Sequence, residues 1–501
     1  MPRKNVRPVI IGVGQCVNRP GDVTETKGVM DLTEEAIRRA EEDSRGLHLA
    51  EKVDTLWLAN MFSASHRNPP EQLADRLGAH PKSTAYTWVG ATAPQWFVNR
   101  MAQEIVSGQV RIGLICGGEA LYSRRLEVRA GKSEAWDWQF PEKEPWMVGD
   151  LRDPVSSLEL KYGLMLPIHF YPLFENALRH HDGLSIEGHR EELGRFCSQC
   201  SSIAAENPYA WFRQSRTTDE IVGVSPANRM VVFPYTKSMC SIMEVDQAAA
   251  LFMTDEETAK ELQIPKEKWV YPRGIGDASD IWHVSERAEF YASPSVRYAA
   301  QTALEQAQIS IEEIDYFDLY SCFPCAPRMT RNMLGIPKDD PRPLTITGGM
   351  PCFGGPGNNY SLHAICSMVE LLRREPERTG MVQALSWFIS KHSVGVYSGL
   401  PGKTPWRPVE RSKYQAAIDR IKGPPIVEEV SGKAMVETYM VLHDRESRPV
   451  SSVIVGRLED GSRFLARSEP HEETLTALTK QEPIGSWGKV TPRDGYNTFI
   501  L

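Results

Sequence analysis

One helix–loop–strand pattern occurs twice in this chain, in two stretches that lie far apart. Near the N-terminus, a helix predicted over residues 32–42 is followed by an acidic loop and a strand predicted over 53–59. Residues 298–320 repeat this order, with an alanine-rich helix, an Ile-Ser-Ile-Glu-Glu loop and an apolar strand that ends at Tyr320. A supersecondary unit that recurs in this way indicates internal duplication. The chain is therefore predicted to contain two similar α/β halves.

The first part of the chain alternates between predicted strands and predicted helices. We expect strands at 9–13, 53–59 and 111–116, and helices at 32–42 and 94–106. Apolar strands that alternate with amphipathic helices form mostly parallel sheets that are covered by helices on both faces. The core is therefore predicted to be of the α/β class.

Two regions differ from this core. Residues 120–230 are rich in Trp, Pro, His and charge, and helices are predicted there at 168–180 and 186–205. Insertions of this kind over one end of a core commonly build substrate pockets. Beyond a proline-rich linker at 401–408, short strands, tight turns and one helix indicate a small antiparallel β-barrel of OB type. Its strands are expected at 432–442, 450–458, 462–466 and 484–491, and its helix at 471–479.

A chain of 501 residues is too long for a single hydrophobic core. We predict an N-terminal half over residues 7–240, which includes the inserted helical loop domain at about 120–230. A C-terminal half over 241–400 and an OB-fold-like domain over 409–501 follow.

Composition and charge narrow the class of protein. A formal net charge of −8 argues against a general nucleic-acid binder. No apolar run is long enough for a transmembrane helix, and the first residues lead directly into a strand rather than a signal peptide. Nine scattered cysteines fit a reducing cytoplasm better than a disulfide framework. We expect a cytoplasmic protein without a membrane or nucleic-acid partner, and nucleic-acid binding through the OB-like domain is the weakest alternative.

Two groups of residues raise the question of a metal ion. Two Cys-x-x-Cys pairs could together supply four thiolates to zinc, but one pair falls within a predicted helix and a long stretch of chain separates them. These pairs are Cys197/Cys200 and Cys322/Cys325. Three histidines of the insertion and a neighbouring carboxylate are either a second metal site or solvated side chains at helix ends. They are His169, His180, His181 and Asp182. We expect no metal.

The stretch Gly348–Asn359 is the strongest local marker of a site. It is a glycine-dense loop that contains Cys352, and the residues after it predict a helix. Glycine is used where the backbone takes positive φ or comes very close to another group. A helix N-terminus presents unpaired N–H groups and a partial positive charge. The loop and the helix that follows it together indicate either a site where backbone N–H groups bind an anionic ligand or a plain glycine-rich turn.

Several motifs in this order resemble the thiolase superfamily over about residues 7–400. More specifically, the chain is similar to thiolase-like proteins, usually labelled acetyl-CoA acetyltransferase, that carry an additional C-terminal OB-fold domain. The motifs are Phe174-Glu175-Asn176, Arg190–Ser201, Pro234–Ser241, Asp246–Ala250, Tyr320–Phe323 and Gly348–Gly357.

The resemblance implies a duplicated, five-layered αβαβα core, and two copies of the chain that pair through the core sheet. It also implies coenzyme A as the substrate thioester and the making or breaking of a C–C bond next to that thioester. In the family a cysteine takes the acyl group, a histidine activates it and a second cysteine moves the proton. Backbone N–H groups hold the oxyanions.

This sequence departs from the family pattern at the positions that carry the chemistry. The nucleophilic cysteine is absent from the stretch that begins at Gly90 and Ala91, and the histidine of the family's Gly-His-Pro motif is replaced in Gly354-Gly355-Pro356. Ser386 stands in place of the second cysteine, and Tyr320 in place of an Asn or His. We assign Gly90, Ala91, Gly354 and Gly355 to substrate binding.

Five side chains remain as candidates for catalysis. Tyr320 has a phenol that gives or takes a proton, and His392 is the best remaining general base because its ordinary pKa is near neutral. Cys322 and Cys352 are thiols that could act as displaced nucleophiles, and Ser386 is a weak replacement for a proton-moving cysteine. Three functions stay open: an acetyl-CoA acetyltransferase-like acyltransferase, a tyrosine-dependent retro-aldolase acting on acyl-CoA esters, and a non-catalytic acyl-CoA-binding protein.

Overall fold

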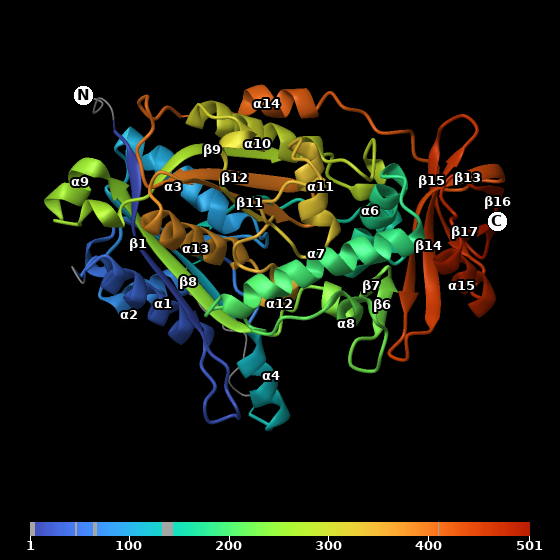
Figure 1. The fold of residues 1–501 in the computed structure, drawn as a ribbon, viewed down its shortest axis with the longest axis horizontal. Helices are drawn as coiled ribbons and strands as arrows, with labels where there is room; N and C mark the ends of the chain where they lie inside the picture. Colours follow the sequence, from blue (N-terminus) through green and yellow to red (C-terminus); the bar gives the residue numbers. More distant parts are fainter. Residues whose placement is uncertain (1–5, 46–47, 64–67, 133–143, 409) are drawn as a thin grey trace.

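The computed structural model describes residues 6–45, 48–63, 68–132, 144–408 and 410–501. Two β-sheets form the core, and a small β-barrel lies at one end of the molecule, with a long helix running across the front toward it (Figure 1). Residues 133–143 of the predicted insertion, and residue 409 at the predicted start of the third domain, lie outside the described residues.

The first sheet has six strands in the order β1-β8-β4-β2-β3-β5. The strands β2, β3, β4 and β5 run parallel to one another, whereas β8 lies antiparallel between β1 and β4. The expectation of mostly parallel strands was therefore incomplete, because a strand from beyond the insertion returns through the middle of the sheet. The bounds are β1 Pro8–Val17, β2 Thr55–Leu58, β3 Ser83–Thr87, β4 Ile112–Ala120, β5 Met147–Val148 and β8 Asp246–Asp255.

The second sheet has four strands in the order β10-β11-β12-β9, and it is also mixed. Only β10 and β11 run parallel; β12 is antiparallel to both of its neighbours. The bounds are β9 Tyr271–Ser279, β10 Tyr316–Leu319, β11 Thr379–Ser386 and β12 Lys391–Ser398.

Helices complete the five layers that the resemblance implied. Two helices, α3 and α13, pack between the sheets, α1 and α2 cover the outer face of the first sheet, and α10 and α14 cover the second. The αβαβα core is thus confirmed. The bounds are α1 Val29–Asp43, α2 Pro69–Leu77, α3 Ala93–Ser107, α10 Pro294–Ala307, α13 Tyr360–Arg374 and α14 Arg411–Ile418.

Both halves bring an outer helix against its strand in the same way. A Cβ atom on Gly14 of β1 would lie 2.1 Å from a backbone oxygen of α1, and one on Gly276 of β9 would lie 1.9 Å from a backbone oxygen of α10. Only glycine permits so close an approach. This shared Gly-x-Gly contact (Gly12/Gly14 and Gly274/Gly276) is a structural mark of the duplication.

The insertion consists mainly of helices, as predicted. The longest, α7, packs against the glycine-dense loop, where its Ala204 lies against the backbone of Gly348. The helices are α4 Leu121–Arg129, α5 Ser157–Lys161, α6 Pro167–His181, α7 Ile186–Glu206 and α8 Thr218–Val222. Two short strands end the region, β6 Met230–Phe233 and β7 Tyr235–Thr236, and α9 Glu256–Glu261 follows β8.

Five C-terminal strands close into a barrel in the order β13-β14-β15-β17-β16, with β16 pairing back to β13. All pairs are antiparallel except β15 with β17. This is the strand order of an OB fold, with its helix between the third and fourth strands. The bounds are β13 Gly432–His443, β14 Pro449–Leu458, β15 Arg463–Ser468, α15 Glu472–Lys480, β16 Trp487–Arg493 and β17 Tyr496–Ile500.

Buried polar contacts fix the barrel to the rest of the chain. Arg463 is fully buried; it pairs with Glu437 at 2.6 Å and donates to the backbone carbonyl of Ser285 at 2.7 Å. The amide of Asn176 in α6 donates to the carbonyl of Tyr439 at 3.0 Å. The barrel also continues into β6, which pairs with β13.

Candidate functional site

The glycine-dense loop is held by close packing. Four of its glycines have positive φ: Gly348, Gly349, Gly354 and Gly357. A one-turn helix, α12 Met350–Phe353, lies within the loop, and α13 begins at Tyr360. A Cβ atom on Gly348 would lie 2.4 Å from that of Ala204 in α7. The glycines therefore let the loop press closely against its protein neighbours.

Ser241 occupies the space that a side chain on Gly355 would need. A Cβ atom on Gly355 would lie 2.3 Å from the Oγ of Ser241 and 3.0 Å from the terminal methyl of Met350. The N–H of Gly355 donates to the carbonyl of Ile242 at 2.8 Å. At Gly354, a Cβ atom would lie 2.6 Å from the Oε1 of Gln247. The position where the family has its histidine is thus sterically closed.

Tyr320 and Cys322 lie inside a hydrophobic cluster beside this loop. The Tyr320 ring meets the Tyr360 ring edge to face at 5.5 Å, and the carbonyl of Cys322 accepts from the N–H of Ser241 at 3.0 Å. Burial raises the pKa of the Tyr320 phenol well above its ordinary value. Burial also raises the pKa of Cys322 to about 12. Both groups are therefore protonated at neutral pH.

His392 is buried with a partner at each ring nitrogen. The amide nitrogen of Gln383 lies 2.9 Å from Nδ1, and the Oγ of Ser293 lies 3.2 Å from Nε2. Because an amide nitrogen can only donate, Nδ1 accepts and the imidazole proton is on Nε2. Burial lowers the pKa of His392 to about 4. The Oε1 of Gln383 accepts from the N–H of Tyr320 at 3.1 Å, so Gln383 links the two predicted residues.

Ser386 ties β11 to the start of α3. Its Oγ accepts from the N–H of Thr92 at 2.7 Å and lies 2.8 Å from the Thr92 hydroxyl. A Cβ atom on Gly90 would lie 3.2 Å from the same Oγ. The carbonyl of Ala91 accepts from Ser361 of α13 at 3.3 Å. Gly90, Ala91 and Ser386 therefore lie close together at the start of α3.

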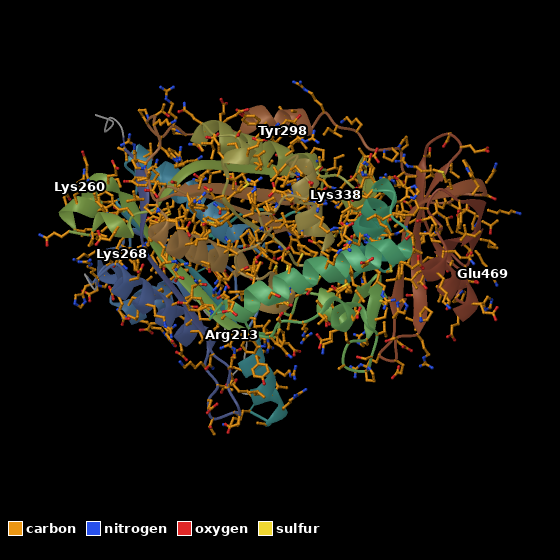
Figure 2. All side chains as sticks on the ribbon, in the orientation of Figure 1. Arg213, Lys260, Lys268, Tyr298, Lys338 and Glu469 are labelled. Carbon is orange, nitrogen blue, oxygen red and sulfur yellow. The ribbon has the colours of Figure 1, made fainter. Side chains whose placement is uncertain are left out.

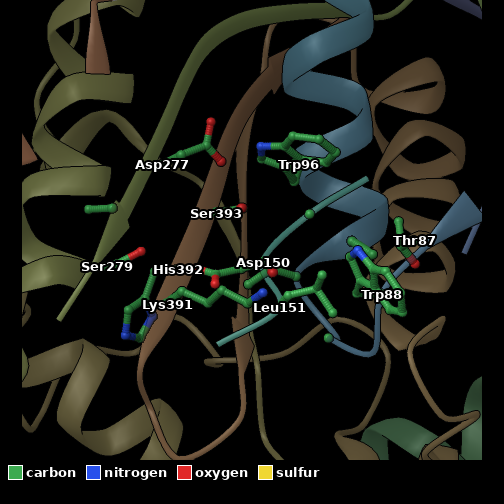
Figure 3. Close-up of a pocket in the computed structure, with 15 residues that line it drawn as sticks. Thr87, Trp88, Trp96, Asp150, Leu151, Asp277, Ser279, Lys391, His392 and Ser393 are labelled. Carbon is green, nitrogen blue, oxygen red and sulfur yellow. The ribbon is translucent and has the colours of Figure 1, made fainter. Parts of the chain in front are cut away.

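A cleft of about 280 Å³ opens on the other side of Gly90, with Trp88 and Trp96 among its walls (Figure 3). Lys391 lies in it with its side chain directed toward Asp150 and Leu151. A Cβ atom on Gly90 would lie 3.1 Å from the Lys391 ammonium nitrogen. Gly90 and His392 are the two predicted site residues that line this cleft.

A second cavity, of about 130 Å³, lies beside Cys352. Arg216, Lys237 and Ser238 line it, together with Ile242, the neighbour of Ser241. The Arg216 guanidinium donates to the Ser238 hydroxyl at 3.0 Å. Burial raises the pKa of Cys352 to about 11, although the positive charge of Arg216 opposes this shift. Cys352 is also half-buried, whereas the other eight cysteines are buried.

The structure thus distributes the predicted residues over three neighbouring places. Cys322 and Gly355 both contact Ser241, Gly90 and Ala91 lie beside Ser386, and Cys352 faces a cavity of its own. Tyr320 packs on Tyr360 and shares Gln383 with His392. Sequence reasoning did not single out Ser241, Thr92, Lys391, Arg216 or Lys237 as site residues. Ser241 was visible only as the end of a family motif, and Lys391 only as the neighbour of His392.

Across the described ranges, no group of three or more His, Cys, Asp or Glu side chains is placed to hold a metal ion. His181 stacks on Tyr291 with the ring centres 4.0 Å apart, and Asp182 pairs with Lys338. No described helix has both the length and the apolar character needed to cross a membrane.

Two sheets enclosing α3 and α13, with a glycine-dense loop at the start of α13, define a thiolase-like α/β protein. The particular family follows from two comparisons. The chain is 33% identical to the monomeric SCP2-thiolase-like protein type 1 from Mycobacterium smegmatis, with complete coverage of both chains and a TM-score of 0.85. Residues 413–495 match the family model described as the thiolase-like protein type 1 additional C-terminal domain. The chain belongs to the type 1 SCP2-thiolase-like proteins.

The chain is more distantly similar to a thiolase subunit and to an aldolase. The chain is 26% identical over 146 residues to the benzoylsuccinyl-CoA thiolase subunit BbsB of Thauera aromatica. This match covers 29% of the chain and 36% of that subunit. The Ltp2-ChsH2(DUF35) aldolase shares the fold, with a TM-score of 0.59 and 18% identity over 78% of this chain and 97% of its own.

Proposed function

We propose that this protein binds the thioester end of an acyl-CoA in the cavity beside Cys352. The observation that carries the proposal is the composition of this cavity, where cations meet a thiol next to the Ser241–Gly355 contact. Arg216 and Lys237 offer charged N–H donors to the carbonyl oxygens of the thioester and of the pantetheine arm, and hydrogen bonds from charged donors are the stronger ones. A volume of about 130 Å³ admits the end of an acyl-pantetheine arm and leaves the nucleotide part outside. The name of the BbsB relative supports a CoA ester as the ligand class.

Binding without thiolysis is the function that the geometry favours. Thiolysis needs a thiolate and a base beside it. The stretch that begins at Gly90, where the family has its nucleophile, contains no cysteine. Ser241 fills the space beside the histidine position, and both nitrogens of His392 already have partners. Tyr320, with its raised pKa, can only donate a proton, so the tyrosine-dependent cleavage would require a separate base.

Acyl transfer to Cys352 is the second candidate, and its exposure to the cavity is the observation that favours it. In this step the Cys352 sulfur would attack the thioester carbonyl and form a new thioester. The bond to the CoA sulfur would break, and the thiol proton would leave on coenzyme A. A C–C bond next to the thioester could then form or break on the bound acyl group, as in the family.

Calorimetric titration with acetyl-CoA and with coenzyme A tests binding and places it. We expect Arg216→Gln to weaken binding about tenfold and Lys391→Met, in the cleft of Figure 3, to leave it unchanged. Loss of binding in Lys391→Met alone would move the site to that cleft, and no binding by the unaltered protein would overturn the proposal. Mass spectrometry after incubation separates the two functions: an acyl adduct that is absent in Cys352→Ser establishes acyl transfer.

The same family relationship bears on assembly. The Mycobacterium smegmatis relative is described as monomeric. In this chain β5 pairs with the end of β3, at Tyr86 and Thr87, and so covers part of the sheet edge that β3 would otherwise expose. We infer a monomer, in place of the paired chains that the resemblance implied. A cytoplasmic location stays a prediction.

A further inference from the structure

A cavity of about 660 Å³, larger than those beside Gly90 and Cys352, lies between α7 and α11 (Cys325–Met333). It is on the opposite flank of α7 from the Cys352 cavity: Ser201 faces that cavity, whereas Arg195 and Gln199 face this one. The loop after α11 supplies the remaining wall, and its Lys338 is labelled beside α11 in Figure 2. Five cations line the cavity, namely Arg195, Arg328, Arg331, Lys338 and Arg342.

Four of these cations have carboxylate partners. Arg328, at the back of the cavity, pairs with both Glu175 and Glu192, at 2.6 and 2.7 Å. The other three pairs are Arg195 with Glu191, Lys338 with Asp182 and Arg342 with Asp340. These pairs hold the cationic groups in place around the opening without consuming all of their N–H donors, because each guanidinium carries five.

Arg331 differs from the other four. It is only 9% exposed, and its Nε and one terminal nitrogen donate to the amide oxygen of Asn332 at 3.2 and 3.0 Å. Among the residues that the structure describes, no carboxylate lies within ion-pair distance of it. Burial and the neighbouring charge of Arg328 lower the pKa of Arg331, and the charges of Glu192 and Asp182 oppose this shift only in part. A largely buried guanidinium that no carboxylate pairs directly gains from an anion that comes to it.

The cavity offers what an organic phosphate requires. Guanidinium groups bind phosphate oxygens in a two-pronged geometry. Phe196 and Leu344 form an apolar wall beside the cations, and Ser202 and Thr218 add hydroxyl groups. We propose that this cavity binds a small phosphate-bearing molecule, with Arg331 as the cation that its phosphate neutralises. This site is independent of acyl-CoA binding at Cys352.

Titration calorimetry with pyrophosphate, at low salt and without coenzyme A, tests the site. We expect the unaltered protein to bind pyrophosphate and Arg331→Gln to bind it at least tenfold more weakly, with Arg331→Lys between them. Arg129→Gln, an exposed arginine at the end of α4, is the matched control for loss of one positive charge and should bind as the unaltered protein does. Adenosine monophosphate and inorganic phosphate, as parallel probes, show whether the ligand needs an organic part.

Folding of the variant is checked separately by thermal unfolding without ligand. Because Arg331 has no carboxylate partner, Arg331→Gln should unfold at the same temperature as the unaltered protein or higher. Equal pyrophosphate binding by the unaltered protein and Arg331→Gln would overturn the proposal. So would binding that disappears in Arg216→Gln but persists in Arg331→Gln, since that result would place the phosphate beside Cys352.

Discussion

The Oγ of Ser241 occupies the space into which a side chain on Gly355 would project, 2.3 Å from the position of its Cβ. Gly355 has an ordinary backbone conformation, so the exclusion is purely steric. A side chain at position 355 therefore requires the Ser241 hydroxyl and the Met350 methyl to move.

Gly355→Ala should destabilise the protein by about 1–3 kcal/mol, the usual range for overpacking a buried site. Ser241→Gly should remove most of that loss when combined with it, because it deletes the clashing hydroxyl. Urea unfolding of the two single variants and the double variant measures this coupling. Gly402→Ala, whose nearest neighbour would be 3.7 Å away, is the control. Additive effects of the two substitutions would show that the contact is not the cause.

Cys352 should be the single thiol that reacts quickly in the native protein, because the other eight cysteines are buried. Its pKa of about 11 predicts a rate of modification that rises about tenfold per pH unit between pH 7 and 10, as the thiolate fraction rises. A colorimetric thiol assay at several pH values measures both. Cys352→Ser should abolish the fast phase. The eight buried thiols should still react slowly, as the protein unfolds. A fast phase that survives in Cys352→Ser would show that at least one of the other eight cysteines is accessible, and would contradict this prediction.

His392 should make stability depend on pH. The folded-state pKa of about 4 lies below the value of about 6.5 expected for an unfolded histidine, so the unfolded chain binds the proton more tightly. The stabilisation is complete above pH 6.5 and is lost as pH falls toward 4, by about 3 kcal/mol at most. The quantity to measure is the difference in unfolding free energy between the unaltered protein and His392→Gln across that window. His80→Gln, an exposed histidine, should show no such difference.

Removal of the Arg463 charge should loosen the barrel. Arg463→Met leaves the carboxylate of Glu437 with only Arg457, and it deprives the carbonyl of Ser285 of its donor. Breaking a buried ion pair on one side costs about 3–5 kcal/mol. Thermal unfolding should show the loss, and Arg448→Met, at an exposed ion pair, should change little. If the two variants lose equal stability, the buried Arg463 contacts contribute no more to stability than an exposed ion pair does.

Light scattering coupled to size-exclusion chromatography should give the mass of a single chain at micromolar concentration. The end of the β3 edge, at Tyr86 and Thr87, is already paired with β5, so a second copy could not pair with the whole of β3 unless β5 moved. The carbonyl of Val148 accepts from the N–H of Trp88 at 2.9 Å, so the backbone groups of Val148 face β3. Substitution of Val148 by proline therefore removes an N–H on the paired side of this short strand and tests whether β5 blocks association. A dimer in the unaltered protein would refute the monomer, and a variant that stays monomeric would show that β5 is not what prevents pairing.

Much of the fold could be predicted because apolar periodicity marks each element locally. The structure contains the strand expected near residue 9 and the helix expected near residue 32. It also contains most of the expected barrel elements, although their first and last residues differ from those predicted. The last strand, β17, was not predicted although Asp494-Gly495 is a hairpin signal, and both residues indeed have positive φ. The antiparallel place of β8 could not be predicted, because it depends on where a long insertion returns the chain.

The site was less predictable than the fold, for a physical reason. The motifs located Gly355, Ser386 and Tyr320 by their order in the chain, which requires no knowledge of contacts. Whether His392 has a free nitrogen depends on Ser293 and Gln383, which come from different parts of the sequence. The closure of Gly355 likewise depends on Ser241, whose approach follows from tertiary packing alone.

The place of β8 between β1 and β4 also has a consequence for how the chain folds. The first strand cannot find its neighbour until residues 246–255 have been synthesised, long after β1 itself. Pairings between such distant segments make folding slow and leave apolar strand edges open in the meantime. A fragment that stops short of β8 would expose two such edges at once, so we expect truncated forms of the first half to aggregate rather than fold.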